Sequence, residues 1–517
     1  MEKDHDLEAT VGGAGDRAEP PINPSGHRQE LDRNFHLINI CGLGLTSGNT
    51  WIAIGGSIVV AIYNGGPPGV IYELIASSVF YWLIAASLAE LASAMPSSGG
   101  VYHWASVTGG RYGRICGFFA GWWNFLAWVL GIAATAQIIG AQAVSMYALF
   151  HPDFETQRWQ VFVAYLICIW GCCLIVLFAN KALPAIEALG GFLVLAGLVI
   201  TVIICATLPH TKGNGYASSD FVWRDWQNDA GYSSNGFVFC LGMLNGAFAV
   251  GTPDVITHLA EEVPRPGRNI PKAMLAQYVI GFITAFTYLI TIFYSISDLD
   301  EVLESNFLFP LAEIYLQASS SAGGALGLLI LALLPSIVAV IGCYLTASRV
   351  FWTLARDNAT LFPSYYSQVH PKHRNPFNSI LLCGIICTLL GCIYVGNQTA
   401  FSAFVSSFVV LSTLSYLAAV LPHLLSCRSL ITPGWFWMPG AIGFAVNGLT
   451  CLYIAAFVVI FCFPFALPVD AQTMNYTSLI TGGLTVFVGC FWFWKQKDYE
   501  GPHFVPLESA FLAKDAV

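Results

Sequence analysis

The chain has 517 residues, of which 56% are hydrophobic and 10% are charged, and its mean hydropathy is +0.65. Soluble domains carry about 25% charged residues, so this composition excludes a protein that folds mainly in water. The net charge of −9 does not fix the orientation of such a chain, because acidic residues contribute little to membrane topology.

The first 36 residues are polar, contain glycine and proline, and lack an apolar core. They predict a disordered cytoplasmic tail at 1–36 with no cleavable signal. Beyond them, apolar runs recur at close to the roughly 20 residues that cross the hydrocarbon. We expect an all-α polytopic membrane protein, with a transmembrane domain at 37–494 and a second cytoplasmic tail at 495–517. Twelve transmembrane helices are predicted, at residues 37–63, 71–95, 115–149, 160–178, 185–208, 236–260, 274–296, 323–348, 377–395, 400–421, 437–463 and 477–494.

The lysines and arginines are distributed unevenly between the two sides of this topology. Of the 21 in the chain, only Arg158, Lys212 and Arg224 fall on the side opposite the amino terminus. Cytoplasmic loops carry the excess of these residues. The pattern therefore predicts that both termini are cytoplasmic, which requires an even number of spans.

Two of the predicted spans contain interruptions. The first includes "GLGLTSGNTW" (42–51), and the sixth includes "AVGTPD" (249–254), with Pro253 and Asp254 inside an apolar run. Proline removes a backbone donor and breaks a helix, and an aspartate at the centre of a membrane helix costs about 3 kcal/mol. The five-span offset between the two interruptions gives the halves opposite orientations, and paired broken helices of this kind indicate a transporter's midplane site.

Irregular backbone at membrane depth persists only where it is buried in protein or lines a wet cavity. The freed backbone groups become binding groups, and half-helix amino termini favour a carboxylate. Glycines that let helices pack closely are the alternative explanation for a single interruption. Two interruptions at symmetric positions favour a substrate cavity.

Three segments carry a resemblance to a known family: "SLAELASAMPSSGGVYHWAS" (87–106), "HLAEEVPRPGRNIPKAM" (258–274) and "SRVFWTLARDNATLFPSYYSQVHPKHRNP" (348–376). They resemble the amino acid–polyamine–organocation (APC) superfamily and, within it, the fungal amino acid/choline permease family. The resemblance runs over nearly all of residues 30–495. It implies a five-plus-five inverted repeat with broken helices 1 and 6, followed by two extra helices.

The resemblance also implies substrate-binding positions at both breaks. At the first break, backbone and side-chain groups contact the charged head of the substrate, with Trp51 as a nearby wall. At the second, Pro253 stands where many relatives have an aromatic residue. The resemblance therefore does not determine which residues contact the cargo on that side of the pocket. Carried over by position, the set is Thr46, Ser47, Gly48 and Asn49 in the first span and Gly251, Thr252 and Asp254 in the sixth.

Asp254, His258 and Glu262 recur every four residues, so a helix would align them on one face towards the cytoplasm. Histidine titrates near neutral pH, and the three are candidates for a proton path. A static alternative is an inner gate in which the acidic residues pair with Arg265 and Arg268.

Aromatic residues matter if the cargo is a quaternary amine, because such cations bind over ring faces. Trp123 and Phe248 are the preferred pair, with Trp51, Trp122, Trp128 and Tyr344 as further candidates; most aromatic residues are expected to pack or to lie at the membrane interface. The "HPKH" run (370–373) is not expected to bind metal, and no cofactor or nucleic-acid partner is predicted.

These features predict a secondary active transporter of the plasma membrane, not an enzyme. It would import an amino acid or a choline-like amine by alternating access, coupled to a proton, with the lipid bilayer as its surroundings. The alternatives are a non-transporting nutrient sensor of the same fold and a membrane-embedded enzyme. The sequence leaves the cargo open, since an amino acid needs partners for a carboxylate and an ammonium, whereas choline needs only a cation cage.

Overall fold

The computed structural model describes residues 26–502 except Arg28, 49–50, 59–61, Asn214, Asn306, 397–398 and Gln472. The expected disorder of residues 1–25 and most of the tail beyond Lys495 lies outside the described residues. Residues 29–36 pack against the helices, where Leu31 and Phe35 are 3% and 1% exposed.

The described chain is helical throughout, as predicted. Among the described residues, eleven helices are long and apolar enough to cross a membrane, counting α1 and α2 as one. The sixth predicted span holds the shorter α9, because it ends at the break. The spans are α1 (Leu37–Ser47) with α2 (Trp51–Gly56), α3 (Gly66–Ala94), α5 (Gly113–Ala148), α6 (Arg158–Phe178), α7 (Leu183–Lys212), α9 (Asn235–Val250) with the 3₁₀ turn η4 (Thr257–Glu262), α10 (Pro266–Ser295), α13 (Ala322–Arg356), α15 (Phe377–Gly396), α16 (Ala400–Leu425), α17 (Gly440–Ile460) and α18 (Thr477–Lys495).

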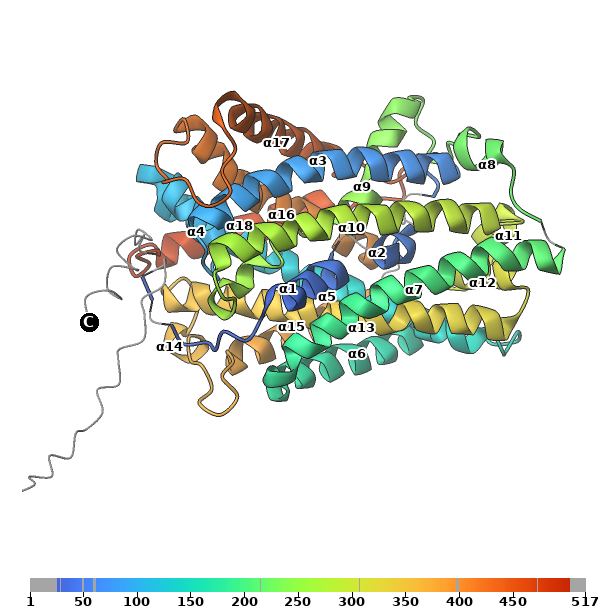
Figure 1. Ribbon diagram of the computed structural model, residues 1–517, viewed down its shortest axis with the longest axis horizontal. Coiled ribbons are helices and arrows are strands. Elements are labelled where there is room, and N and C mark those ends of the chain that lie inside the picture. The colour runs from blue at the N-terminus through green and yellow to red at the C-terminus, as the bar shows by residue number, and fades with distance from the viewer. Residues whose placement is uncertain are drawn as a thin grey trace, which may run out of the picture.

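Short helices join the spans, and the sequence did not predict them. They are α4 (Val101–Thr108), α8 (Ser219–Trp223), α11 (Leu299–Glu304), α12 (Leu311–Ser319) and α14 (Pro363–Tyr366). α14 lies at one end of the bundle and α8 and α11 lie at the other (Figure 1). We call the end with α14 and residues 29–36 the tail end, and the end with α8 and α11 the loop end.

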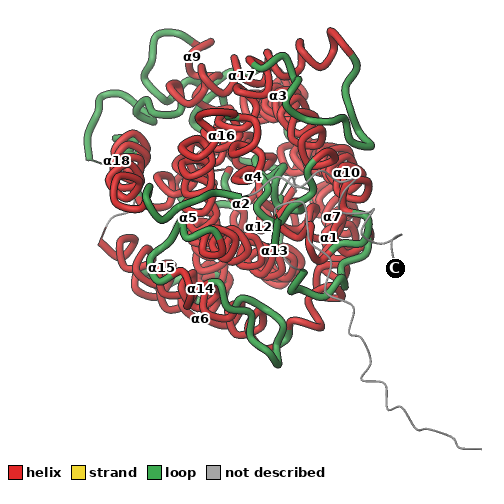
Figure 2. Tube along the Cα trace, turned by 90° about the vertical axis from the view of Figure 1, so that its left-hand side faces the viewer, coloured by secondary structure: helices red, strands yellow, loops and turns green. Residues whose placement is uncertain are grey.

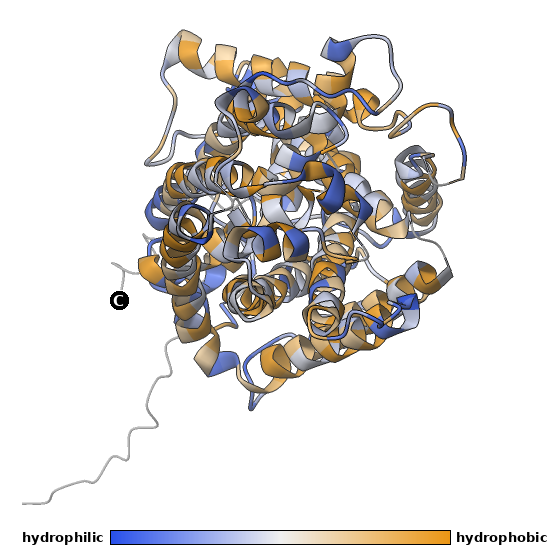
Figure 3. Ribbon diagram, turned by 90° about the vertical axis from the view of Figure 1, so that its right-hand side faces the viewer, coloured by the Kyte–Doolittle hydropathy of each residue, from blue (hydrophilic) through white to orange (hydrophobic). Residues whose placement is uncertain are grey.

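The spans form a central group and a rim. α5 packs against α4, α6, α13 and α16, and the end-on view places α5, α13 and α16 inside the bundle with α6 and α18 at its edge (Figure 2). Apolar residues run along the helices seen from the loop end (Figure 3). The apolar core of α16 is 78% buried and that of α18 is 22% buried, so the last span faces mainly outwards.

Both broken spans part where the sequence predicts. α1 ends at Ser47, Gly48 is extended with φ −161° and ψ 158°, and α2 begins at Trp51. α9 ends at Val250, and the chain turns through residues 251–256 before η4. The two breaks touch: a Cβ added to Gly48 would lie 1.4 Å from Oγ1 of Thr252. Only glycine permits this approach.

Candidate functional site

A small cavity lies at the contact between the two helix breaks. It holds about 50 Å³ of space open to water-sized solutes, and α5, α13 and α16 contribute to its wall besides the broken spans. It is lined by Thr46, Ser47, Gly48, Ile52, Ala53, Trp128, Gly131, Thr135, Ile138, Phe248, Ala249, Thr252, Ser336, Ala339, Cys343 and Phe408.

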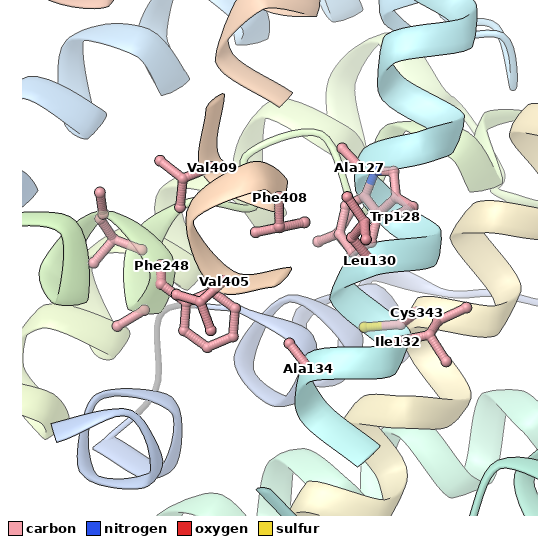
Figure 4. Packing of buried hydrophobic residues seen from close by; sticks show 14 of the residues in the cluster. Ala127, Trp128, Leu130, Ile132, Ala134, Phe248, Cys343, Val405, Phe408 and Val409 are labelled. Atoms are coloured by element: carbon pink, nitrogen blue, oxygen red, sulfur yellow. The ribbon is translucent and has the colours of Figure 1, made fainter. Parts of the chain in front are cut away.

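Three aromatic rings form one corner of this cavity. Phe408 of α16 lies 5.7 Å, between ring centroids, from Trp128 of α5 and 5.7 Å from Phe248 of α9. The interplanar angles are 72° and 80°, the edge-to-face arrangement that aromatic pairs prefer. Figure 4 shows these three side chains with Cys343 of α13 nearby. We call Trp128, Phe248 and Phe408 the aromatic corner.

The rest of the lining includes hydroxyl groups but carries no charge. Hydroxyl groups come from Thr46, Ser47 and Thr252 at the breaks, and from Thr135 and Ser336. None of the described lining residues is a lysine, arginine, histidine, aspartate or glutamate. Charged groups therefore act on the cavity only from behind its wall.

Asp254 is one such group, and it is fully buried. Its Oδ2 accepts hydrogen bonds from Asn124 Nδ2 at 2.7 Å and Trp128 Nε1 at 3.1 Å. Its Oδ1 accepts from the Tyr416 hydroxyl at 2.5 Å. His258 Nε2 lies 3.0 Å from Oδ2. Asp254, whose charge is costly in an apolar span, thus has four hydrogen-bonding partners. One of them is the indole N–H of Trp128 in the aromatic corner.

His258 is also buried between two acceptors. Its Nδ1 lies 3.0 Å from the Ser98 carbonyl oxygen, and its Nε2 lies 3.0 Å from Asp254. The Ser98 carbonyl oxygen only accepts, so Nδ1 is the donor in that contact. The ring therefore connects the Ser98 backbone to the Asp254 carboxyl group through two buried contacts.

The predicted three-residue proton path is only partly assembled. Asp254 and His258 meet, but Glu262 forms an ion pair with Arg349 at 3.0 Å instead of continuing the path. The expectation of one helical face is wrong, because residues 257–262 form a 3₁₀ turn rather than an α-helix. The predicted pairing with Arg265 and Arg268 is also replaced, since Glu261 binds Arg356 of α13 at 2.7 Å.

Several predicted binding residues do line the cavity: Thr46, Ser47, Gly48, Thr252 and Phe248. Trp128, a further candidate, also lines it, whereas Trp51, Trp122, Trp123 and Tyr344 do not. Trp51 is buried against α7, where its Nε1 donates to the Val194 carbonyl at 2.9 Å, and Trp123 donates to Thr485 of α18 at 3.0 Å. Tyr344 is fully buried outside the lining, which its neighbour Cys343 joins instead.

The other predicted positions have different outcomes. Gly251 is not part of the lining, and its carbonyl accepts a bond from Tyr416 at 3.4 Å. Asn49 lies outside the described residues. No group of three histidine, cysteine, aspartate or glutamate side chains in the described part of the chain could hold a metal ion.

The sequence interpretation missed several residues of this region. Phe408 and Thr135 line the cavity, and Asn124 holds Asp254. Glu187 of α7 is fully buried, and its Oε2 accepts from the Thr46 hydroxyl at 3.1 Å. An acidic residue inside a span is a signal that sequence alone offers for Glu187; the other three carry none.

The tail end closes the bundle beneath the site. Gln29 donates to the Glu261 carbonyl at 2.7 Å, and the Phe35 amide donates to that of Glu262 at 3.0 Å. Glu30 lies beside these contacts, and burial raises its pKa while Arg356 opposes this effect. Residues 29–35 therefore seal the turn that leads down from Asp254.

A helical bundle with two spans broken around a shared enclosed cavity is the architecture of a membrane transporter. Comparison with known proteins agrees. The chain matches the amino acid permease family over residues 40–486, and it belongs to that family. It is 34% identical over 474 residues to a choline transporter of Saccharomyces cerevisiae, and the match covers 90% of this chain and 82% of the relative.

More distant matches cover as much of the chain. It is 26% identical over 490 residues to a GABA-specific permease of the same yeast, covering 92% of this chain and 84% of the relative. Among solved structures, a manganese transporter of Eremococcus coleocola matches with a TM-score of 0.53 and 14% identity, covering 89% of this chain and 93% of that one. This last likeness shows the fold alone. The chain is a multi-pass membrane transporter, not an enzyme.

Proposed function

We propose that the protein imports a choline-like organic cation by alternating access, binding its ammonium head at the aromatic corner. The observation that carries this proposal is the wall of the cavity, in which three aromatic rings converge and no described side chain is charged. Ring faces attract a quaternary ammonium and provide nothing for a carboxylate.

An amino acid is the second candidate, and the hydroxyl groups of the lining favour it. Hydroxyls of Thr46, Ser47 and Thr252, together with backbone amides freed at the breaks, could hold a carboxylate. However, no described lysine or arginine lines the cavity to balance that charge. The similarity to a choline transporter exceeds that to the GABA-specific permease, which also favours the cation.

The loop end supports a cationic cargo from a distance. Its exposed acidic residues outnumber its basic ones, and a surface with one dominant sign raises the local concentration of opposite charges. We take this end to face outwards and the tail end to be cytoplasmic, because lysine and arginine concentrate on the tail side. The acidic residues are Asp153, Glu155, Asp220, Asp225, Asp229, Asp298, Asp300, Glu301, Glu304 and Asp470.

We further propose that the plasma membrane is the location and that transport is coupled to a proton. The Asp254–His258 pair is the candidate for the coupling group, because it is buried, titratable and bonded to Trp128 of the aromatic corner. Rocking of one helix group about the breaks would alternately expose the cavity to the two sides.

The test is counterflow in vesicles that contain the purified protein and unlabelled choline. Labelled choline should accumulate transiently inside, and external choline should compete better than γ-aminobutyrate or neutral amino acids. Competition by amino acids with no effect of choline would refute the cation assignment. Binding of choline without counterflow would identify a sensor instead of a carrier.

A further inference from the structure

A second buried carboxylate lies away from the cavity, between α3 and α9. Glu73 is in the second turn of α3 and is 1% exposed. Neither of its carboxyl oxygens has a hydrogen-bond partner among the described residues. Asp254 and Glu187 each have at least one donor, so Glu73 is the buried acid whose state these contacts leave unexplained.

The carboxyl group fits against α9 only because residue 242 is glycine. A Cβ added to Gly242 would lie 2.0 Å from Oε1 of Glu73 and 2.4 Å from Oε2. Further along the same helix, Gly246 approaches the Ser77 hydroxyl, at 2.8 Å from an added Cβ. The contact between Glu73 and Gly242 therefore reports how closely α9 approaches α3.

The titratable groups around Glu73 do not neutralise it. The Cys240 thiol on α9 is the neighbour that its charge influences. On α10, Tyr288 bonds to Tyr315 at 2.7 Å and Tyr294 bonds to Trp223 at 3.0 Å. On α17 the ring of Tyr453 stacks on Phe80, and on α8 Asp220 pairs with Arg224. None of these groups makes a hydrogen bond or ion pair with Glu73 within the described chain.

An ionised carboxylate buried without a partner costs far more than the neutral acid. The packing of α9 on α3 seen here therefore requires that Glu73 carry a proton. α9 also leads directly to the site: Phe248 of the aromatic corner lies six residues beyond Gly242, about 9 Å along the helix. Movement of α9 away from α3 would hydrate Glu73 and shift that corner together.

We propose that Glu73 is a proton-binding site that controls closure of the loop half of the bundle. When α9 lies away from α3, the hydrated carboxylate takes up one proton from the loop side and becomes a carboxylic acid. The neutral acid then packs against Gly242, and opening returns the proton. This inference rests on the proposed function, since it assigns the loop end to the outside and closure to the transport cycle.

The consequence is a dependence of influx on external pH. A hydrated glutamic acid titrates near pH 4.3, so above that value the fraction ready to close falls about tenfold per pH unit. Where closure limits the rate, choline influx should fall about 80-fold between external pH 5 and pH 7.

The test compares Glu73→Gln with Glu304→Gln, which removes an exposed acidic residue at the loop end. Glu73→Gln needs no proton to close, so its influx should change less than about twofold over the same pH range. Glu304→Gln should keep the wild-type slope. A wild-type slope in Glu73→Gln overturns the proposal.

A second pair of variants covers the case in which Glu73→Gln does not fold. Gly242→Ala should slow influx at every pH, because its Cβ occupies the carboxyl position. Adding Glu73→Ala should restore influx and make it independent of pH; restored influx with the wild-type slope would overturn the proposal. Choline counterflow at equal pH on both sides separates the two hypotheses. If wild-type protein shows counterflow and Glu73→Gln keeps the wild-type pH slope of influx, only the role of Glu73 fails. If wild-type protein shows no counterflow, the proposed function fails too.

Discussion

Phe408 offers the sharpest test of the aromatic corner, through its replacement by leucine. The change removes a ring that lies 5.7 Å from both Trp128 and Phe248 while keeping an apolar side chain. A cation over an aromatic face gains about 0.5–2 kcal/mol. Since about 1.4 kcal/mol is a tenfold change in affinity, Phe408→Leu should raise the Kd for choline about 2- to 30-fold.

The assay is calorimetric titration of the purified protein with two ligands of the same shape. Choline carries the charge, and 3,3-dimethylbutan-1-ol replaces its ammonium with a neutral carbon. Loss of packing weakens both ligands, whereas loss of the cation–ring attraction weakens only choline. The ratio of their affinities therefore isolates the electrostatic part.

Trp123→Leu is the matched control, because Trp123 faces α18 and does not line the cavity. It should leave both affinities within about twofold, as for surface changes of less than 0.5 kcal/mol. An equal loss for both ligands in Phe408→Leu would refute the cation–ring reasoning. So would a selective loss for choline in Trp123→Leu.

Three further changes test the structure around the site. Asp254→Asn should abolish uptake with normal surface expression, because His258 loses its carboxyl partner; normal pH-dependent uptake would remove Asp254 from the mechanism. Gly48→Ala should reduce uptake more than tenfold, because its Cβ would lie 1.4 Å from Oγ1 of Thr252, and Thr252→Gly should restore part of it; full activity of the single variant would contradict this contact. Arg349→Met should destabilise the protein by about 3–5 kcal/mol by leaving Glu262 buried and unpaired, and a melting curve should show partial recovery with Glu262→Gln.

The sequence predicted the parts of the fold that depend on local chemistry. Length and hydropathy located the spans, and glycine, proline and aspartate marked both breaks. Of the residues placed at the breaks by family likeness, Thr46, Ser47, Gly48 and Thr252 line the cavity.

The aromatic residues were harder to assign because apolar side chains occupy most of α5. Bulky rings occur on several of its faces, so an aromatic residue alone does not show which face points inwards. Trp123 and Trp128 are five residues apart on the same helix, yet one faces α18 and the other the cavity. Phe408 enters from α16, whose sequence contains no break or charge to mark it.

The polar partners were invisible for a related reason. Asn124 and Tyr416 are far from Asp254 along the chain, and only tertiary packing brings them within 2.7 Å and 2.5 Å. The alignment of Asp254, His258 and Glu262 on one face depends on a regular α-helix through residues 254–262, and residues 257–262 form a 3₁₀ turn instead. The interruption that marks the site also ends the α-helical periodicity on which that alignment depended.

Occupation of the cavity by cargo can be measured directly at Cys343, a lining residue. A methanethiosulfonate reagent bearing a trimethylammonium group resembles choline and forms a mixed disulfide with an accessible thiol. Mass spectrometry can follow that modification, with the exposed Cys427 as an internal reference. Saturating choline should slow modification of Cys343 at least tenfold and leave modification of Cys427 unchanged. Equal rates at Cys343 with and without choline would contradict the assignment of this cavity as the binding site.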